Sequence, residues 1–351
     1  MDRAHDRPPR TARPRESITK MTNHRPLPNG RKARIAVLDD YMGVAHRLAD
    51  WSRLSDRAEV TFLTHAIAPT DLARELAPFD AICLLRERTD MPGDLLRALP
   101  NLAAIAATGR QNRTLDSDTA AALGIPVMTT DGSGNGVFAT VELAWGLILG
   151  LMRHIPAESR AMQHGAWQTR LGNALYGRTL GVIGLGRLGQ RMALVARAFG
   201  MNVIAWSPNL TPERAQKGGA DYATKETLFQ TADVVSLHLV LGPTTHGIIS
   251  AQEIAAMKST ALLINTSRGP LVDAAALTDA LANDRIGGAG IDVYDIEPLP
   301  TDAPIRTMHN VLTTPHLGYA VQETFESFYE QTVENLDSWL NGKPQRLISA
   351  K

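Results

Sequence analysis

The sequence predicts an α/β protein built on parallel sheets with helices on both faces. Short apolar, β-rich runs alternate with segments of helical periodicity, and successive runs lie roughly 20 to 30 residues apart, the spacing expected of β–α–β units. A glycine-rich stretch, GVIGLGRLGQ at 181–190, joins one apolar run to a helical segment. The 351 residues are enough for two separate hydrophobic cores.

Bulk composition excludes several classes of protein. Hydrophobic residues make up 44% and charged residues 21%, as in ordinary globular chains, and the formal net charge is zero. We therefore expect no nucleic-acid partner and no membrane association. The uncharged part of the most apolar segment, residues 143–152, is half the roughly 20 residues that a membrane-crossing helix needs. A single cysteine, Cys83 in AICLL, predicts a buried thiol, no disulfide framework and a cytoplasmic location.

Residues 1–32 differ from the rest of the chain. They hold nine Lys/Arg against three Asp/Glu, several prolines and almost no apolar side chains. Such a segment cannot bury enough surface to offset the entropy of ordering, so it is predicted to be a disordered basic tail. Two interpretations stay open: an inert or over-extended start, which we favour, and an arm that binds nucleic acid.

The first set of alternating elements follows that tail. Strands are predicted at 34–40, 60–65, 81–85, 103–109 and 127–130. Helical periodicity marks 71–77, 94–100 and the neighbourhood of 119–123. The turn-rich TTDGSGNG, 129–136, then breaks the pattern, and an apolar helix is expected from about residue 139.

A second set fills the rest of the chain. Strands are predicted at 179–184, 202–207, 234–239, 261–266, 288–294 and 310–316. The final stretch, QETFESFYEQTVENLDSWLNG, is predicted to be an amphipathic helix that Asn341 and Gly342 end.

The glycine-rich stretch carries the first functional signal. Gly184, Gly186 and Gly189 form G-x-G-x-x-G, with an apolar strand before them and a helix, ended by Gly200, after them. The three glycines permit a tight turn, close approach of a pyrophosphate, and close packing of helix on strand. We predict dinucleotide binding here, in preference to a strand–helix turn without a ligand.

The strand that follows leaves the identity of the dinucleotide open. An acid about 20 residues after the glycines grips the ribose hydroxyls of NAD in this type of site. Here NVIAWSPNL places Ser207 at that point, which neither repels a 2′-phosphate nor binds a diol as a carboxylate would. Both NAD and NADP therefore remain candidates.

Three ionisable residues follow the ends of later predicted strands. Arg268 follows ALLINTS, Glu297 follows GIDVYDI, and His316 follows VLTTP. Because ligands bind outside the carboxyl ends of strands in open α/β sheets, we expect the three to converge beside the dinucleotide. There an arginine can bind a carboxylate and polarise the adjacent carbonyl, a histidine can donate a proton, and a glutamate can orient that histidine.

These motifs resemble the D-isomer-specific 2-hydroxyacid dehydrogenases. The matching stretches are GVIGLGRLGQRMALVARAFG, LLINTSRGPLVD, GIDVYDIEPLP and NVLTTPHLGY, and the likeness covers about residues 34–345. The resemblance implies an NAD(P)-dependent oxidoreductase that acts as a 2-oxoacid reductase, with Arg268 binding substrate, His316 as acid/base and Glu297 as its partner. It also implies that Gly109 and Arg110 lie beside the substrate carboxylate. Cofactor contacts are implied for Gly184, Gly186, Arg187, Leu188, Gly189, Ser207, His238, Thr244, Thr266, Asp292 and Gly318.

The resemblance also implies an architecture of two Rossmann-like/flavodoxin-like domains, one inserted in the other. The substrate domain would comprise 33–139, the NAD(P)-binding Rossmann domain 140–316, and a C-terminal helix within 317–351 would return to the substrate domain. It implies a homodimer, with the apolar helix 141–152 near the partner. No cluster of His, Cys and Asp has metal-ligand spacing, so no metal is predicted.

The sequence departs from the family pattern in two further places. Only the histidine of the usual His-x-Pro is present, in His238-Leu239-Val240, and the usual Gly-Val-Gly-x-Asp loop reads TGRQNRTLD. Two other functions stay open: a dinucleotide-sensing scaffold resembling the C-terminal binding protein corepressors, and a phosphite dehydrogenase.

Overall fold

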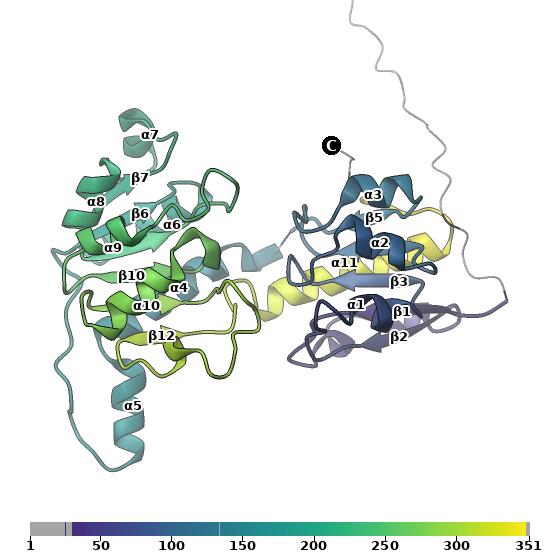
Figure 1. Ribbon diagram of the computed structural model, residues 1–351, viewed down its shortest axis with the longest axis horizontal. Coiled ribbons are helices and arrows are strands. Elements are labelled where there is room, and N and C mark those ends of the chain that lie inside the picture. The colour runs from purple at the N-terminus through teal and green to yellow at the C-terminus, as the bar shows by residue number, and fades with distance from the viewer. Residues whose placement is uncertain (1–24, 26–29, 133, 349–351) are drawn as a thin grey trace, which may run out of the picture.

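Two separate parallel sheets form the protein in the computed structural model, which describes residue 25 and residues 30–132 and 134–348. Figure 1 shows them in two lobes, with α11 (Gln322–Leu340) running from between the lobes into the first lobe. We call the lobe with the five-stranded sheet the first lobe and the lobe with the seven-stranded sheet the second lobe. The predicted α/β class with parallel sheets is confirmed.

The sheet of the first lobe has the strand order β2-β1-β3-β4-β5. Its strands are β1 (Ala33–Val37), β2 (Ala58–Phe62), β3 (Ala81–Leu84), β4 (Ala104–Ala107) and β5 (Val127–Thr129). Its other elements are α1 (Leu72–Leu76), α2 (Gly93–Ala98), α3 (Ser117–Ala122), η1 (Ala45–Arg47) and η2 (Trp51–Leu54). The order reverses between β1 and β3, so the loops after these two strands open onto the sheet's switch point, where ligands bind in such folds.

The sheet of the second lobe has the order β12-β11-β10-β9-β6-β7-β8 and reverses between β6 and β9. Its strands are β6 (Thr179–Ile183), β7 (Asn202–Trp206), β8 (Asp221–Tyr222), β9 (Val234–Leu237), β10 (Leu262–Asn265), β11 (Gly288–Ile291) and β12 (Val311–Thr313). Its helices are α4 (Ala139–Met152), α5 (Ile155–Gln163), α6 (Arg187–Ala198), α7 (Pro212–Lys217), α8 (Lys225–Thr231), α9 (Ala251–Ala256) and α10 (Ala274–Ala282). Short 3-10 helices are η3 (Gly134–Phe138), η4 (Gly269–Leu271) and η5 (Pro304–Arg306).

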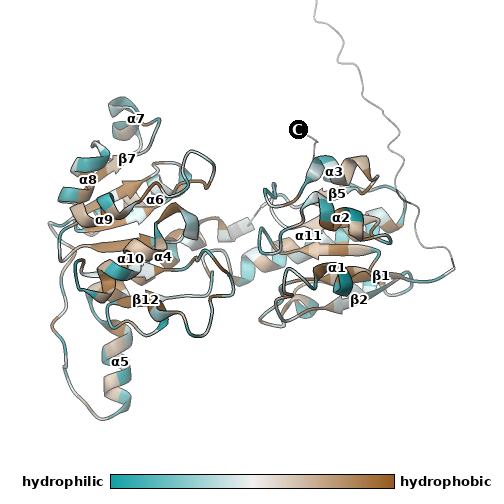
Figure 2. Cartoon of the chain, viewed as in Figure 1, coloured by the Kyte–Doolittle hydropathy of each residue, from teal (hydrophilic) through white to brown (hydrophobic). Residues whose placement is uncertain are grey.

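Alternation along each central strand divides the core into two layers. In β10, Leu262 and Ile264 pack with α4 and α6, whereas Leu263 packs on the opposite face with Phe229 of α8. All four residues of β10 are buried, which explains why its sequence reads as a continuous apolar run. Figure 2 shows the same arrangement: the strands inside each lobe are mostly hydrophobic (brown), and the helices outside carry more hydrophilic residues (teal).

The C-terminal helix completes the first lobe rather than the second. Phe325, Phe328 and Tyr329 of α11 are buried in one cluster with Ile35 and Val37 of β1. The helix ends with Asn341 as its C-cap, and Gly342 adopts a φ of +73° there. The chain therefore crosses between the lobes twice, before α4 and before α11, and the domain boundaries 33–139, 140–316 and 317–351 remain a proposal.

Two features of the fold differ from or extend the sequence predictions. Strand β8, two exposed residues paired with β7, was not predicted, because it lacks an apolar run. The predicted disordered tail, 1–32, lies mostly outside the described residues. Of its described members, Arg25 donates to the carbonyl of Leu102 at 2.8 Å, and Arg31 pairs with Asp80 at 2.7 Å. Cys83 is buried, as predicted.

Most apolar side chains of helix α4 are buried in the core of the second lobe. Val141, Ala144 and Leu147 are buried against β10 and β11, so a role of 141–152 beside a partner stays a prediction. In Figure 1, α5 projects from the second lobe, and the loop after it returns along the outside. In the part of the chain that the structure describes, no helix alone is long and apolar enough to cross a membrane; 136–152 and 155–163, bent by 62°, meet that test only as a pair.

Candidate active site

The glycine turn after β6 is shaped by close contacts that only glycine permits. Gly184 has a φ of +97°, and a Cβ there would come within 2.7 Å of the carbonyl oxygen of His238. A Cβ on Gly189 would lie 2.2 Å from the carbonyl oxygen of Gly184. Gly186, by contrast, has open space around it and caps α6 without any side-chain hydrogen bond. The first turn of α6 therefore presents backbone N–H groups toward an open approach, as an anion site requires.

Two buried polar atoms without partners follow the strands β9 and β10, next along the sheet from β6. Nδ1 of His238, after β9, and Oγ1 of Thr266, after β10, are both buried with no hydrogen bond among the described residues. A buried polar atom without a hydrogen bond costs free energy, so both atoms are suited to bind a polar group of a ligand. Burial lowers the pKa of His238 to about 4, so its imidazole is neutral at pH 7. Ser207 is half-buried and Thr244 exposed. These groups fit a dinucleotide.

Glu297 and His316 form a close pair at the ends of β11 and β12. Nδ1 of His316 lies 2.6 Å from Oε2 of Glu297, and the backbone N–H of Tyr294 donates to the other carboxylate oxygen at 2.9 Å. Burial opposes ionisation of Glu297, but the hydrogen bond and charge of His316 outweigh it, so the pKa of Glu297 is lowered. His316 itself has a φ of +57°, and its N–H donates to the carbonyl of Asp292.

Asp292 holds the backbone that carries the histidine. Its carboxylate accepts from the N–H groups of Leu317 and Gly318, at 2.7 and 2.8 Å, and from the hydroxyl of Thr314. Burial raises the pKa of Asp292, although these hydrogen bonds oppose the shift. The Asp292 carboxylate therefore fixes the backbone of the turn after β12. Gly318 lies close to this carboxylate, which a Cβ at that position would approach to 3.1 Å.

Arg268 stands at the start of η4, directly after β10. Its Nη1 donates to the carbonyl of Ser267 at 2.7 Å, and its Nη2 donates to Oε2 of Glu87 at 2.6 Å. Its backbone is fixed by Asn265, whose side chain donates to the Arg268 carbonyl at 2.8 Å. The contact with Glu87 joins the two lobes, because Glu87 follows β3 of the first lobe.

The loop after β3 was missed by the sequence predictions. Arg86, Glu87 and Arg88 open onto the switch point of the first sheet. Arg88 donates to the Tyr319 hydroxyl at 2.5 Å and to the His316 carbonyl at 3.1 Å. Three charged residues directly after the buried run AICLL were the available signal, since they stand at a parallel strand's carboxyl end. One loop therefore contacts both predicted catalytic residues: Glu87 binds the side chain of Arg268, and Arg88 binds the backbone of His316.

Gly109 and Arg110 are adjacent in the chain but contact different groups. Gly109 has a φ of +86°, and Arg86 lies against it, with Nη1 only 1.6 Å from where a Cβ would be. The guanidinium of Arg110 instead donates to the carbonyl of Asp131 at 2.6 Å and is exposed. Of the two predicted substrate residues, Gly109 therefore lies against Arg86 of the loop after β3, whereas Arg110 is bound to Asp131.

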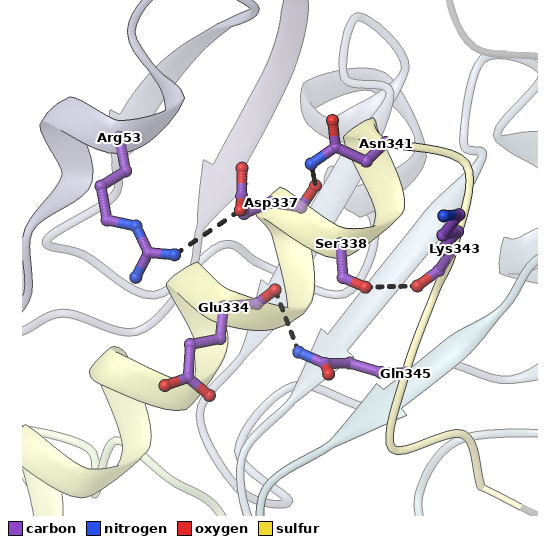
Figure 3. A pocket seen from close by; sticks show the side chains of 7 residues that line it. All are labelled: Arg53, Glu334, Asp337, Ser338, Asn341, Lys343 and Gln345. Carbon is purple, nitrogen blue, oxygen red and sulfur yellow. Dashed lines mark hydrogen bonds and ion pairs between the residues drawn. The ribbon is translucent and has the colours of Figure 1, made fainter.

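A polar surface hollow lies elsewhere, at the C-terminal end of α11 (Figure 3). Its side chains largely satisfy one another: Arg53 pairs with Asp337 at 3.5 Å, and Gln345 donates to the Glu334 carbonyl at 3.2 Å. We assign it no ligand. Among the described residues, no group of three or more His, Cys, Asp or Glu could hold a metal ion.

Comparisons with known proteins place this geometry in context. Residues 145–318 match the family described as D-isomer specific 2-hydroxyacid dehydrogenase, NAD binding domain. The chain is 36% identical to D-3-phosphoglycerate dehydrogenase of Bacillus subtilis over 78% of its length, but spans only 52% of that relative. It is also 36% identical to glyoxylate reductase of Aeropyrum pernix, covering 76% of this chain and 81% of that one. The crystal structure of a phosphoglycerate oxidoreductase from Vibrio cholerae superposes with a TM-score of 0.82 and 37% identity, over 88% of this chain and 99% of that chain.

Proposed function

This chain belongs to the D-isomer-specific 2-hydroxyacid dehydrogenase family, and on that premise we propose that it is an NAD(P)-dependent 2-oxoacid reductase. One observation carries the proposal. The loop after β3 contacts both Arg268 and the backbone of His316, while His316 pairs with Glu297 at 2.6 Å. A carbonyl-polarising guanidinium and an oriented imidazole beside a dinucleotide turn are what reduction of a 2-oxo acid requires.

The cofactor would be held by groups at the switch point of the second sheet. We assign the phosphates to the N–H groups of Arg187, Leu188 and Gly189, and further contacts to Thr266 and His238. A bound nicotinamide coenzyme supplies the hydride. Thr244, Asp292 and Gly318 complete the proposed set of contacts, with Asp292 keeping the turn that presents His316.

Each of the three ionisable residues has a distinct role in the proposal. Glu297 accepts from Nδ1 of His316, so Nε2 is the nitrogen that faces the substrate, and it has no partner among the described residues. The protonated imidazole gives its Nε2 proton to the oxyanion that forms at substrate C2. Nε of Arg268 likewise has no partner among the described residues and can polarise the carbonyl, while Arg86 and Gly109 lie where the substrate carboxylate would bind.

Ser207 makes both coenzymes acceptable in this proposal. The residue that follows β7 is half-buried and uncharged, so a 2′-phosphate meets no repulsion there. Arg214 lies close to this loop, because its Nη1 donates to the Asn209 carbonyl at 2.8 Å.

We also propose that the protein is a homodimer. Large apolar side chains on α5 and the loop after it are exposed: Met162 by 57%, Trp167 by 74%, Leu171 by 94% and Tyr176 by 83%. A monomer rarely exposes so many together, whereas a second copy would cover them. The projecting α5 and its return loop therefore form the proposed dimer arm.

Initial rates on a panel of glyoxylate, hydroxypyruvate and phenylpyruvate, with NADH and NADPH in parallel, test the function. We expect oxidation of at least one coenzyme with at least one of these acids. Tight NADH binding without turnover across the panel would contradict the reductase and favour a dinucleotide-sensing scaffold.

A further inference from the structure

Glu87 already places a carboxylate where an anionic ligand would be expected. Its Oε2 accepts from Nη2 of Arg268 at 2.6 Å. Its Oε1 accepts from the backbone N–H of Arg113 at 3.1 Å and lies 3.5 Å from Nη1 of the same residue. The Glu87 side chain is only 9% exposed. A buried carboxylate therefore bridges an arginine of the second lobe and the loop after β4 of the first lobe.

The remaining arginines of this region are also engaged, with one exception. Arg88 donates to Tyr319 and to the His316 carbonyl, and Arg110 donates to the Asp131 carbonyl. The backbone of Arg86 is hydrogen-bonded to Thr108 and Asn112, but its guanidinium has no hydrogen-bond or ion-pair partner among the described residues. Burial lowers the pKa of Arg86; the charge of Glu87 opposes this shift, and the charge of Arg268 adds to it. It lies against Gly109, so one guanidinium is open for one anionic group.

We propose that Glu87 is a specificity-determining residue that restricts this site to 2-oxo acids carrying a single anionic group. The inference rests on the proposed function. A second anionic group on carbon 3 would find Nη1 and Nη2 of Arg268 already bonded and Arg113 paired with Glu87, and it would face the Glu87 carboxylate. Like charges in a site shielded from water repel strongly, and rejection by an unfavourable contact is a common source of specificity.

The proposal separates two substrate classes named among the relatives. D-3-phosphoglycerate carries a carboxylate and a phosphate, whereas glyoxylate carries one carboxylate. The 36% identity to both relatives does not choose between them. The placement of Glu87 favours the singly anionic class for this chain.

A matched pair of substrates tests it: hydroxypyruvate and its 3-phosphate, which differ only in the second anionic group. For the wild-type protein we expect kcat/KM with hydroxypyruvate to be at least tenfold higher. In Glu87→Gln, the preference should shift at least tenfold toward the phosphorylated acid, mainly through a lower KM for it. A wild-type preference for the phosphorylated acid, or an unchanged ratio in Glu87→Gln, would overturn the proposal.

A control and a second readout keep the result decisive. Glu59→Gln removes an exposed carboxylate on strand β2 of the same lobe and should leave the ratio unchanged. Calorimetric titration of D-glycerate and 3-phospho-D-glycerate into the wild-type protein with NAD needs no turnover. Tighter binding of D-glycerate without turnover would uphold this proposal while the reductase proposal fails. If Glu87→Gln does not fold, Glu87→Ser replaces it, and tighter wild-type binding of the phosphorylated ligand still overturns the proposal.

Discussion

Nδ1 of His316 lies 2.6 Å from Oε2 of Glu297, whose other oxygen accepts from the Tyr294 N–H. The carboxylate is thus held on two sides before it orients the ring. Because Glu297 is an acceptor only when ionised, the hydrogen bond places the proton on Nδ1 of a neutral imidazole. Nε2 is then free to exchange a proton with a substrate, as the proposed function requires, and this assignment can be tested.

His316→Ala should lower turnover of the best 2-oxo acid by about 10³-fold, because it removes the group that protonates the oxyanion. The dissociation constant for NADH, measured by fluorescence titration, should stay unchanged. Full activity in this variant would assign the acid/base role to another residue.

Glu297→Gln should lower the rate of 2-oxoacid reduction at least about tenfold, because the carboxylate that accepts from Nδ1 of His316 orients the ring for proton transfer. Glutamine keeps the shape of the side chain but not its charge. Initial rates with the best 2-oxo acid measure the effect, and an exposed carboxylate on α11 provides the control variant Glu330→Gln, which should keep the wild-type rate. A wild-type rate in Glu297→Gln would mean that the carboxylate is not needed to orient His316.

Ser207→Asp should shift the ratio of kcat/KM for NADPH over NADH toward NADH by at least tenfold. A carboxylate at the end of β7 would bind ribose hydroxyls and repel a 2′-phosphate. Rates with both coenzymes at one fixed 2-oxo acid concentration give the ratio. If the ratio does not move, discrimination depends on another part of the adenosine site.

Leu171→Asp should convert a dimer into monomers, since it places a charge in the most exposed apolar side chain of the proposed dimer arm. Sedimentation velocity across a range of protein concentrations measures the mass. Tyr222→Asp, on edge strand β8, replaces a side chain that is 43% exposed outside the arm and should leave the dimer intact. A monomeric wild-type protein would contradict the proposal.

His238 should make the apo protein less stable as the pH falls from about 6.5 to 4. Its pKa is lowered in the folded state to about 4, so the unfolded chain binds more protons in this window. The stabilisation is full above pH 6.5, and roughly 2 kcal/mol of it should be lost between pH 7 and pH 5. Urea unfolding at both pH values should show a smaller difference in His238→Gln. Equal pH dependence in the two proteins would mean that His238 titrates normally.

Much of the fold could be predicted from the sequence because burial is written into local patterns. Strands such as β6 (TLGVI) and β10 (LLIN) lie inside two-sided cores, so runs of mostly apolar residues without polar alternation marked them. The glycine turn was predictable because its requirements are largely local: Gly184 has a φ of +97°, and Gly189 leaves room for the carbonyl of Gly184 in the same strand–turn–helix unit. Arg268, Glu297 and His316 could be proposed because each follows a recognisable strand.

The sequence by itself determined the strands, the glycine turn and the polar residues that follow strand ends. Only the tertiary structure decided that β8 pairs with β7 and that Glu87 reaches Arg268. The last two residues lie 181 positions apart, in different lobes. Hydrophobic periodicity predicts which face of a helix or strand is buried. It does not predict which side chain from a distant part of the sequence will contact that face. Such long-range contacts depend on how the two lobes pack, and this packing places the Glu87 carboxylate between Arg268 and Arg113.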